Sequence, residues 1–148
     1  MSDVLFYHLT QSPLEATLPN LLEKSLERGW RVCVQGTQRP QLEALDRHLW
    51  TFREDSFLPH GLSWEEHSDH QPILLSDQTV ATADVLMLID GAWSGIESFA
   101  QFERVCLFFD GSNEEAVDKS RGHWKEVKGA GLEAKYWAQE DGTWRQKA

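Results

Sequence analysis

Short runs of apolar residues recur through the sequence and constrain its fold more than any other feature. "RVCVQG" (31–36), "PILLSD" (72–77), "ADVLMLIDG" (83–91) and "RVCLFFDG" (104–111) are each shorter than a typical helix and end at turn-forming residues. The last two in particular are typical of strands buried on both faces, as the strands of parallel sheets are. Segments with helical periodicity alternate with such runs, so the sequence predicts an α/β fold.

Three segments carry the apolar periodicity of amphipathic helices. These helices are expected over residues 14–28, 40–50 and 113–128. Ser12 with Glu15, and Ser112 with Glu115, have the spacing of a capping box at the starts of the first and third helices. Glycines follow the same two helices, so both ends of each are marked in the sequence.

Further strands are predicted near the two ends of the sequence. "DVLFYHL" (3–9) predicts a first strand and "LEAKYWAQE" (132–140) a late one, after which Asp141-Gly142 turns the chain back toward Trp144. Residues 51–72 show no sustained period and are expected to form a long surface connection. Together these elements predict one domain over residues 1–148, a mostly parallel sheet with helices on both faces.

Folds of this kind often bind nucleotides in the turn that follows the first strand. Here that turn reads "HLTQSPLE" and contains no glycine, whereas a P-loop needs glycines that let backbone N–H groups approach phosphate. The sequence therefore predicts a nucleotide-binding-like fold that lacks a P-loop.

No segment gathers the residue types of an enzyme site at a spacing that supports catalysis. "EEHSDH" (65–70) could ligate a divalent metal, but it has no third spaced ligand and lies in a polar, turn-rich segment. We therefore expect no catalytic residue, no metal and no cofactor. The alternative that stays open is a phosphate-binding or metal-dependent α/β enzyme that uses Asp90 and Asp110, two carboxylates at strand ends.

The overall charge of the chain argues against direct binding to nucleic acid. Its 148 residues include 14 Lys and Arg but 24 Asp and Glu, a formal net charge of -10, and binding to a phosphate backbone requires a broad basic face.

No apolar run is long enough to cross a bilayer, and residues 1–10 lack the features of a secretory signal. Cys33 and Cys106 lie in apolar runs, where buried free thiols are expected. A cytoplasmic protein with no membrane contact is predicted.

One segment reverses the sign of this charge. "RGHWKEVKGAGL" lies in a stretch, 119–137, that holds five Lys or Arg against two Glu. At 100° per residue, Ala116, Ser120, His123 and Val127 share one helix face, and a second face gathers Val117, Arg121, Trp124, Lys125 and Lys128. Cations beside an aromatic ring suit a short acidic peptide with an apolar end. The simpler alternative is a solvated surface on which Trp124 only covers the edge of the core.

Several segments together resemble the chi subunit of bacterial DNA polymerase III. They are "LFYHL", "GWRVCV", "LDRHLWTFREDSFLPHG", "PILLSD" and "RGHWKEVKGAGLEAKYWAQEDGTW", which span nearly the whole chain. The resemblance implies an α/β fold without a phosphate loop and a noncatalytic accessory protein of the clamp loader. It implies tethering of the clamp loader to single-stranded-DNA-binding protein, whose acidic C-terminal tail it would bind.

The resemblance also implies a second partner, the psi subunit, which joins chi to the clamp loader. The residues expected to bind the tail are Arg121, Trp124, Lys125, Lys128 and Trp50. Those expected to face psi or the clamp loader are Phe57, Leu58, Pro59 and His60. Val117 stands where some relatives carry a further Lys, so one cationic contact to the tail is expected to be absent.

Overall fold

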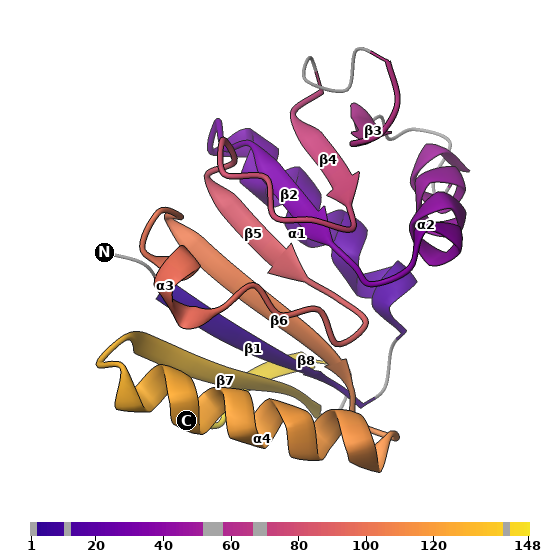
Figure 1. Ribbon diagram of the computed structural model, residues 1–148. Helices are drawn as coiled ribbons and strands as arrows, with labels where there is room; N and C mark the ends of the chain where they lie inside the picture. Colours follow the sequence, from indigo (N-terminus) through magenta and orange to yellow (C-terminus); the bar gives the residue numbers. More distant parts are fainter. Residues whose placement is uncertain (1–2, 11–12, 52–57, 67–70, 141–142) are drawn as a thin grey trace.

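A single eight-stranded sheet runs through the protein (Figure 1). The computed structural model describes residues 3–10, 13–51, 58–66, 71–140 and 143–148. In chain order the strands are β1 (Asp3–Leu9), β2 (Val32–Gln35), β3 (His60–Leu62), β4 (Ile73–Ser76), β5 (Val85–Leu88), β6 (Arg104–Asp110), β7 (Glu133–Glu140) and β8 (Thr143–Gln146). They lie side by side in the order β3-β4-β2-β5-β6-β1-β7-β8. Every neighbouring pair is parallel except β7 with β8, which confirms the predicted mostly parallel sheet.

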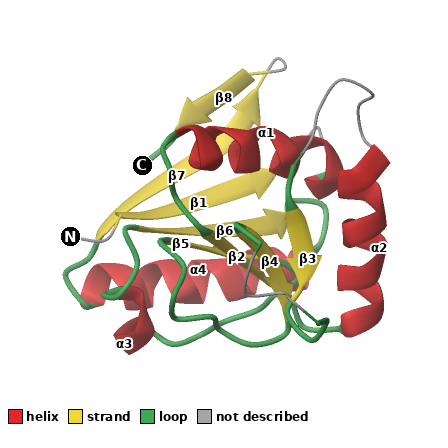
Figure 2. Cartoon of the chain, turned by 90° about the horizontal axis from the view of Figure 1, so that it is seen from above, coloured by secondary structure: helices red, strands yellow, loops and turns green. Residues whose placement is uncertain are grey.

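Two helices cover each face of this sheet (Figure 2). One face carries α1 (Leu14–Glu27) and α2 (Arg39–Thr51), and the other carries α3 (Ile96–Phe99) and α4 (Glu114–Gly129). Because the side chains of a strand alternate between faces, the sheet builds two cores. In β1, for example, Phe6 packs on the α4 side, whereas Leu5 packs on the α1 side.

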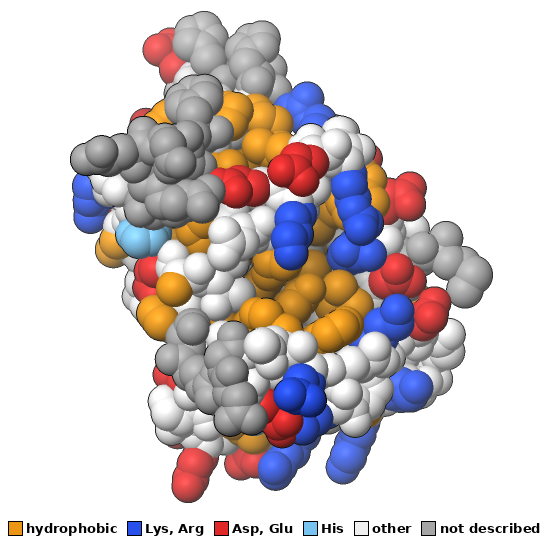
Figure 3. Space-filling view, turned by 180° about the vertical axis from the view of Figure 1, so that it is seen from behind, with side chains coloured by type: hydrophobic (Ala, Val, Ile, Leu, Met, Phe, Trp, Pro, Cys, Tyr) orange, Lys and Arg blue, Asp and Glu red, His pale blue; other side chains and the backbone are white. Residues whose placement is uncertain are grey.

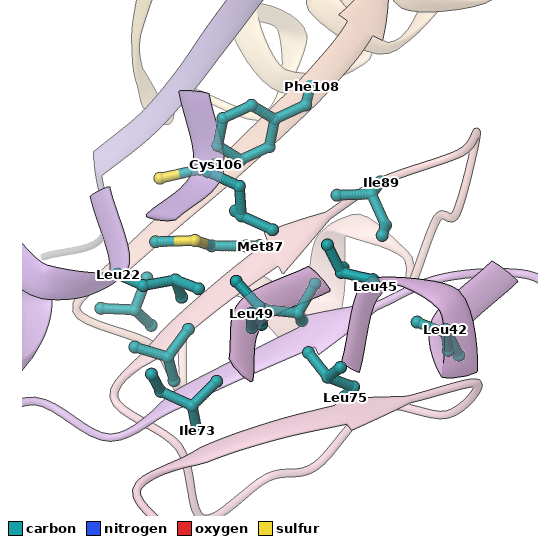
Figure 4. Packing of buried hydrophobic residues seen from close by; sticks show 14 of the residues in the cluster. Leu22, Leu42, Leu45, Leu49, Ile73, Leu75, Met87, Ile89, Cys106 and Phe108 are labelled. Carbon is teal, nitrogen blue, oxygen red and sulfur yellow. The ribbon is translucent and has the colours of Figure 1, made fainter. Parts of the chain in front are cut away.

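The two cores are apolar and close to fully buried. On the α1 and α2 side, Leu22, Leu42 and Leu49 pack against Ile73, Leu75 and Met87 of the sheet (Figure 4). On the other side, Phe99 and Val127 pack against Val105 and Leu107. All four residues of β2, β4 and β5 are buried, as strands covered on both faces require. Cys33 and Cys106 are buried and free, as predicted.

The start of α4 differs from its prediction. Its N-cap is Asn113, whose side chain accepts a hydrogen bond from the Ala116 N–H at 3.2 Å. Ser112 instead turns back toward β6, and its hydroxyl lies 2.7 Å from an Asp110 carboxylate oxygen. The helix ends as predicted, before Gly131, whose φ of +78 is one that glycine adopts readily. Ser12, predicted to cap α1, lies outside the described residues.

Two short elements were not predicted from the sequence. β3 lies inside the stretch expected to be a surface connection, and α3 follows β5. β8 pairs antiparallel with β7 and brings the chain back at Trp144, as the predicted turn requires. Within the described ranges, no helix combines the length and apolar character needed to span a membrane.

Candidate functional site

The outer surface of α4 carries the cations that the sequence singled out. Arg121, Lys125 and Lys128 are exposed, and we call them the α4 cation row. The Arg121 side chain is 75% exposed, and its nearest carboxylate is that of Asp118, one turn earlier, with 3.6 Å between the nitrogen and the oxygen. An ion pair this exposed contributes little to stability, so the Arg121 guanidinium can exchange Asp118 for another carboxylate at small cost.

Trp124 does not project with these cations, which corrects the predicted division of the helix. Its ring packs edge-on against Phe6 of β1 at 5.2 Å between centroids and against Tyr136 of β7 at 5.9 Å. Val117 likewise packs against the core of this side. The helical angle alone grouped Trp124 with the cations, but its large ring reaches back to the sheet. Trp124 also remains next to a cation of the row, because the Lys128 ammonium lies over its ring at 5.7 Å from the centroid.

A polar pair lies beside Arg121 at the carboxyl ends of the strands. The Tyr136 hydroxyl is 2.7 Å from Nδ1 of His8, and both rings are half-buried. Burial lowers the pKa of His8, and the nearby Arg121 charge lowers it further. Burial raises the pKa of Tyr136, while Arg121 opposes this rise. The α4 cation row thus adjoins a polar, partly covered surface formed by β1 and β7.

This pair was missed in the sequence, although a signal for it existed. The register of β1 with β7 places His8 opposite Ala138, two residues beyond Tyr136. Because side chains two residues apart lie on the same face of a sheet, His8 and Tyr136 both lie on the α4 face. Alternation within "LFYHL" and "AKYWA" would have predicted their common face. It would not have predicted that Arg121 lies close enough to affect both.

A second group of predicted residues surrounds β3, at the opposite edge of the sheet. Trp50, at the end of α2, is 47% exposed, and no other large hydrophobic residue among those described is as exposed. Its ring lies 4.1 Å from the His60 ring, between centroids, with a tilt of 36°. We call these two residues, with Leu58 and Pro59, the Trp50–His60 cluster.

Within this cluster His60 is buried and held from both sides. It is 2% exposed, with Nδ1 lying 2.6 Å from the Leu58 carbonyl oxygen and Nε2 lying 3.0 Å from the Asp46 carbonyl oxygen. The Asp46 carboxylate is also near, at 3.3 Å from Nε2. Burial raises the pKa of Asp46, an effect that His60 opposes. Both ring nitrogens therefore lie within hydrogen-bond distance of backbone oxygens, which hold the ring in place.

The other residues predicted to face psi differ in accessibility. Leu58 is 2% exposed and belongs to the core beneath α2, whereas Pro59 is half-buried. Phe57, the leading prediction for that surface, lies outside the described residues. Of this group, the structure therefore offers Trp50 and Pro59 as accessible apolar surface.

The two groups of predicted residues are far apart in the fold. α4 packs on the face that includes Phe6 and Tyr136, whereas α2 packs on the other face and near the β3 edge (Figures 1 and 2). Trp50 was predicted to bind the tail together with Trp124; its ring contacts His60, and its role in tail binding stays a prediction. Each surface is thus a separate candidate.

The strand-end carboxylates of the alternative enzyme line a cleft at the carboxyl edge of the sheet. Its volume is about 870 Å³, and both Asp90 and Asp110 contribute to its wall. Asp90 accepts a hydrogen bond from the Thr37 hydroxyl at 2.7 Å, and Asp110 accepts two from Ser112, which lower its pKa. In the described part of the chain, no three His, Cys, Asp or Glu side chains are grouped as a metal site would require.

Comparison with known proteins gives consistent matches. The family model described as "DNA polymerase III chi subunit, HolC" matches residues 1–135. A Rickettsia prowazekii protein named "Probable DNA polymerase III subunit chi" is 29% identical over 91 residues, 60% of this chain and 55% of that protein. A Pseudomonas aeruginosa protein named "DNA polymerase III subunit chi" is 33% identical over 69 residues, 45% of this chain and 49% of that protein. The chain thus spans about half the length of the curated relatives that it matches.

Proposed function

Because this chain belongs to the DNA polymerase III chi subunit family, we propose that it is a noncatalytic accessory protein of the replication machinery. In this proposal it tethers the clamp loader to single-stranded-DNA-binding protein by binding the acidic C-terminal tail of that protein. No covalent bond is made or broken. Tethering raises the local concentration of the second partner, so two modest affinities suffice.

The observation that carries the tail-binding proposal is the exposure of the α4 cation row beside the His8 and Tyr136 pair. The Arg121 side chain is 75% exposed, and its guanidinium pairs with a carboxylate of its own helix, that of Asp118. A guanidinium can hold a carboxylate through two parallel hydrogen bonds. Lys125 and Lys128 extend the positive charge toward the C-terminal end of α4, where the helix dipole favours cations. An acidic segment lying along α4 would meet all three.

The Trp50–His60 cluster supports a second, separate contact for psi or the clamp loader. Trp50 exposes an unusual amount of aromatic surface, and buried His60 fixes the backbone beneath it. Exposed rings of this kind are frequent anchors of protein interfaces. Two surfaces on opposite faces of the sheet let one molecule hold two partners at once, as a tether must.

No specific observation favours the alternative enzyme. Four carboxylates line the wall of the large cleft, which would repel a phosphate group: Glu15, Asp90, Asp110 and Glu115. Lys119 also lines it, but its ammonium lies 3.1 Å from the Gly91 carbonyl oxygen.

The tail-binding proposal is tested with a fluorescein-labelled peptide that copies the C-terminal tail of the single-stranded-DNA-binding protein from the same organism. Fluorescence polarisation should show Arg121→Ala binding about thirtyfold more weakly, roughly 2 kcal/mol, because a charge-assisted contact is lost. Lys125→Ala should have a smaller effect that shrinks as salt rises, since a surface lysine acts as a screened point charge.

Arg47→Ala is the matched control, because Arg47 is an exposed arginine on α2, on the other face of the sheet. It should bind the peptide like the parent protein. Trp50→Ala tests which partner Trp50 contacts. Unchanged peptide binding assigns Trp50 to the second contact, and weakened peptide binding assigns it to the tail site. If Arg121→Ala is folded and binds normally, the α4 cation row is not the tail site.

A further inference from the structure

The face of the sheet that carries α1 contains a small apolar hollow. It is lined by Tyr7, Leu21, Trp30, Met87 and Cys106, and its volume is about 70 Å³. We call it the α1-face hollow. Figure 3 looks onto this face and shows hydrophobic side chains gathered in a depression with Lys and Arg side chains around it. At about 30 Å³ for one water in the liquid, the space suits the end of one small side chain.

The rim of the α1-face hollow is cationic. Lys24 comes from the last turn of α1, Arg28 is the C-cap of that helix, and Arg104 comes from β6. The guanidinium carbons of Arg28 and Arg104 lie 4.9 Å and 5.3 Å from the centroid of the Trp30 ring. One carboxylate, that of Asp3, lies 3.8 Å from Arg104. Three cations around one apolar hollow, in a chain of net charge -10, favour a ligand that is itself acidic.

Two nitrogen donors on this face lack a hydrogen-bond acceptor. Nε of Arg104 and Nε1 of Trp137 are buried and have no partner among the described residues. Trp137 lies directly opposite Tyr7 in the register of β7 with β1, so the two side chains share the α1 face. An unpaired buried N–H group costs about 1–3 kcal/mol.

The apolar surface continues from the hollow toward the end of the sheet. Tyr7 stacks on Phe108 with 5.0 Å between ring centroids, and Trp144 of β8 meets Tyr7 edge-on at 5.3 Å. A short extended segment could therefore place one side chain in the hollow and keep contact with rings beyond it.

We infer that the α1-face hollow is a docking site for an acidic peptide segment that carries one small apolar side chain. The apolar side chain occupies the hollow, and the carboxylates meet Lys24, Arg28 and Arg104. Single-stranded DNA fits less well, because three cations neutralise few phosphates and the rest of the chain repels the strand. This surface lies on the face of the sheet opposite α4, so it is independent of the tail-binding site proposed above.

The test uses the indole N–H signals of the seven tryptophans in ¹⁵N-labelled full-length protein, assigned with single Trp→Phe variants. The probe is acetyl-Glu-Glu-Leu-Glu-Glu-amide, and its matched control replaces every Glu with Gln. We expect a saturable shift of the Trp30 signal, whose ring lines the hollow, with the acidic probe and none with the neutral one. The Trp124 signal, on α4, should not move.

Charge-reversing variants complete the test. Lys24→Glu with Arg28→Glu, two exposed positions, should weaken binding of the probe at least about tenfold, while Lys125→Glu on α4 should leave it unchanged. The inference is overturned by shifts confined to Trp124, by equal binding of the neutral probe or by the absence of saturation. It is overturned equally if an oligo(dT) strand displaces the peptide, or if a dimer of the protein covers the hollow.

Discussion

The α4 surface and the Trp50–His60 cluster both place an aromatic ring beside ionisable side chains, yet they expose opposite members of the pair. On α4 the cations face solvent and the Trp124 ring packs against Phe6 and Tyr136. At the β3 edge the Trp50 ring faces solvent and the imidazole of His60 is buried. The first surface is suited to attract charge, and the second is suited to bury apolar area. The same residue types therefore support two different kinds of contact.

The largest expected difference between the two regions is in the role of their tryptophans. Trp124→Ala should lower the free energy of unfolding by about 3 kcal/mol, because it leaves a cavity against Phe6 and Tyr136. Trp50→Ala should lower it by less than about 1 kcal/mol, because the ring is 47% exposed. Urea unfolding followed by circular dichroism measures both. Equal losses, or a larger loss for Trp50, would break the comparison.

A smaller effect is expected at His60. His60→Gln should lower the free energy of unfolding by about 2 kcal/mol, because both donors of an amide lie on one nitrogen and cannot take the positions of the two ring nitrogens beside Leu58 and Asp46. His48→Gln, at a half-buried histidine of α2, serves as control and should cost less than about 1 kcal/mol. If the two variants are equally stable, His60 does not fix the segment under Trp50.

The smallest expected effect is the response of the α4 side to pH. Burial lowers the pKa of His8 and of His123, and the charges of Arg121 and Lys119 lower them further. Below about pH 6.5 the unfolded chain takes up protons that the folded protein resists, so the free energy of unfolding should fall between pH 7 and pH 5.5. The double variant His8→Gln with His123→Gln should show a shallower fall in urea titrations across this range. An unchanged slope would contradict the assignment.

The elements with strong periodicity could be predicted from the sequence, and the weak ones could not. The buried strands follow from short uninterrupted apolar runs, and the helices α1, α2 and α4 follow from longer periodic patterns. β3 comprises only His60, Gly61 and Leu62 after a proline, so no local pattern marks it. It exists because it pairs with β4, and β4 lies more than ten residues further along the chain.

The candidate site was predicted in part for a related reason. The exposure of Arg121, Lys125 and Lys128 follows from their helical positions, since charged side chains on an amphipathic helix face solvent. The position of the Trp124 ring depends on how far this long side chain reaches toward the sheet. The angular position of a residue on the helix does not predict that reach. The separation of Trp50 from Trp124 depended on which face each helix covers, and that is a property of topology.

The helix α4 is capped by Asn113 rather than Ser112, because the Ser112 hydroxyl donates its hydrogen bond to Asp110.

The position of β1 between β6 and β7 has a consequence for how the chain folds as it is synthesised. Both partners of β1 come from much later in the sequence, from Arg104–Asp110 and Glu133–Glu140. At about 5–20 residues per second, β1 is synthesised roughly 5–20 s before the first of its two partners is complete. During that delay the apolar side chains of "VLFYHL" have no native neighbour in the sheet. β1 is thus among the last strands of the sheet to be paired, although it precedes the others in the sequence.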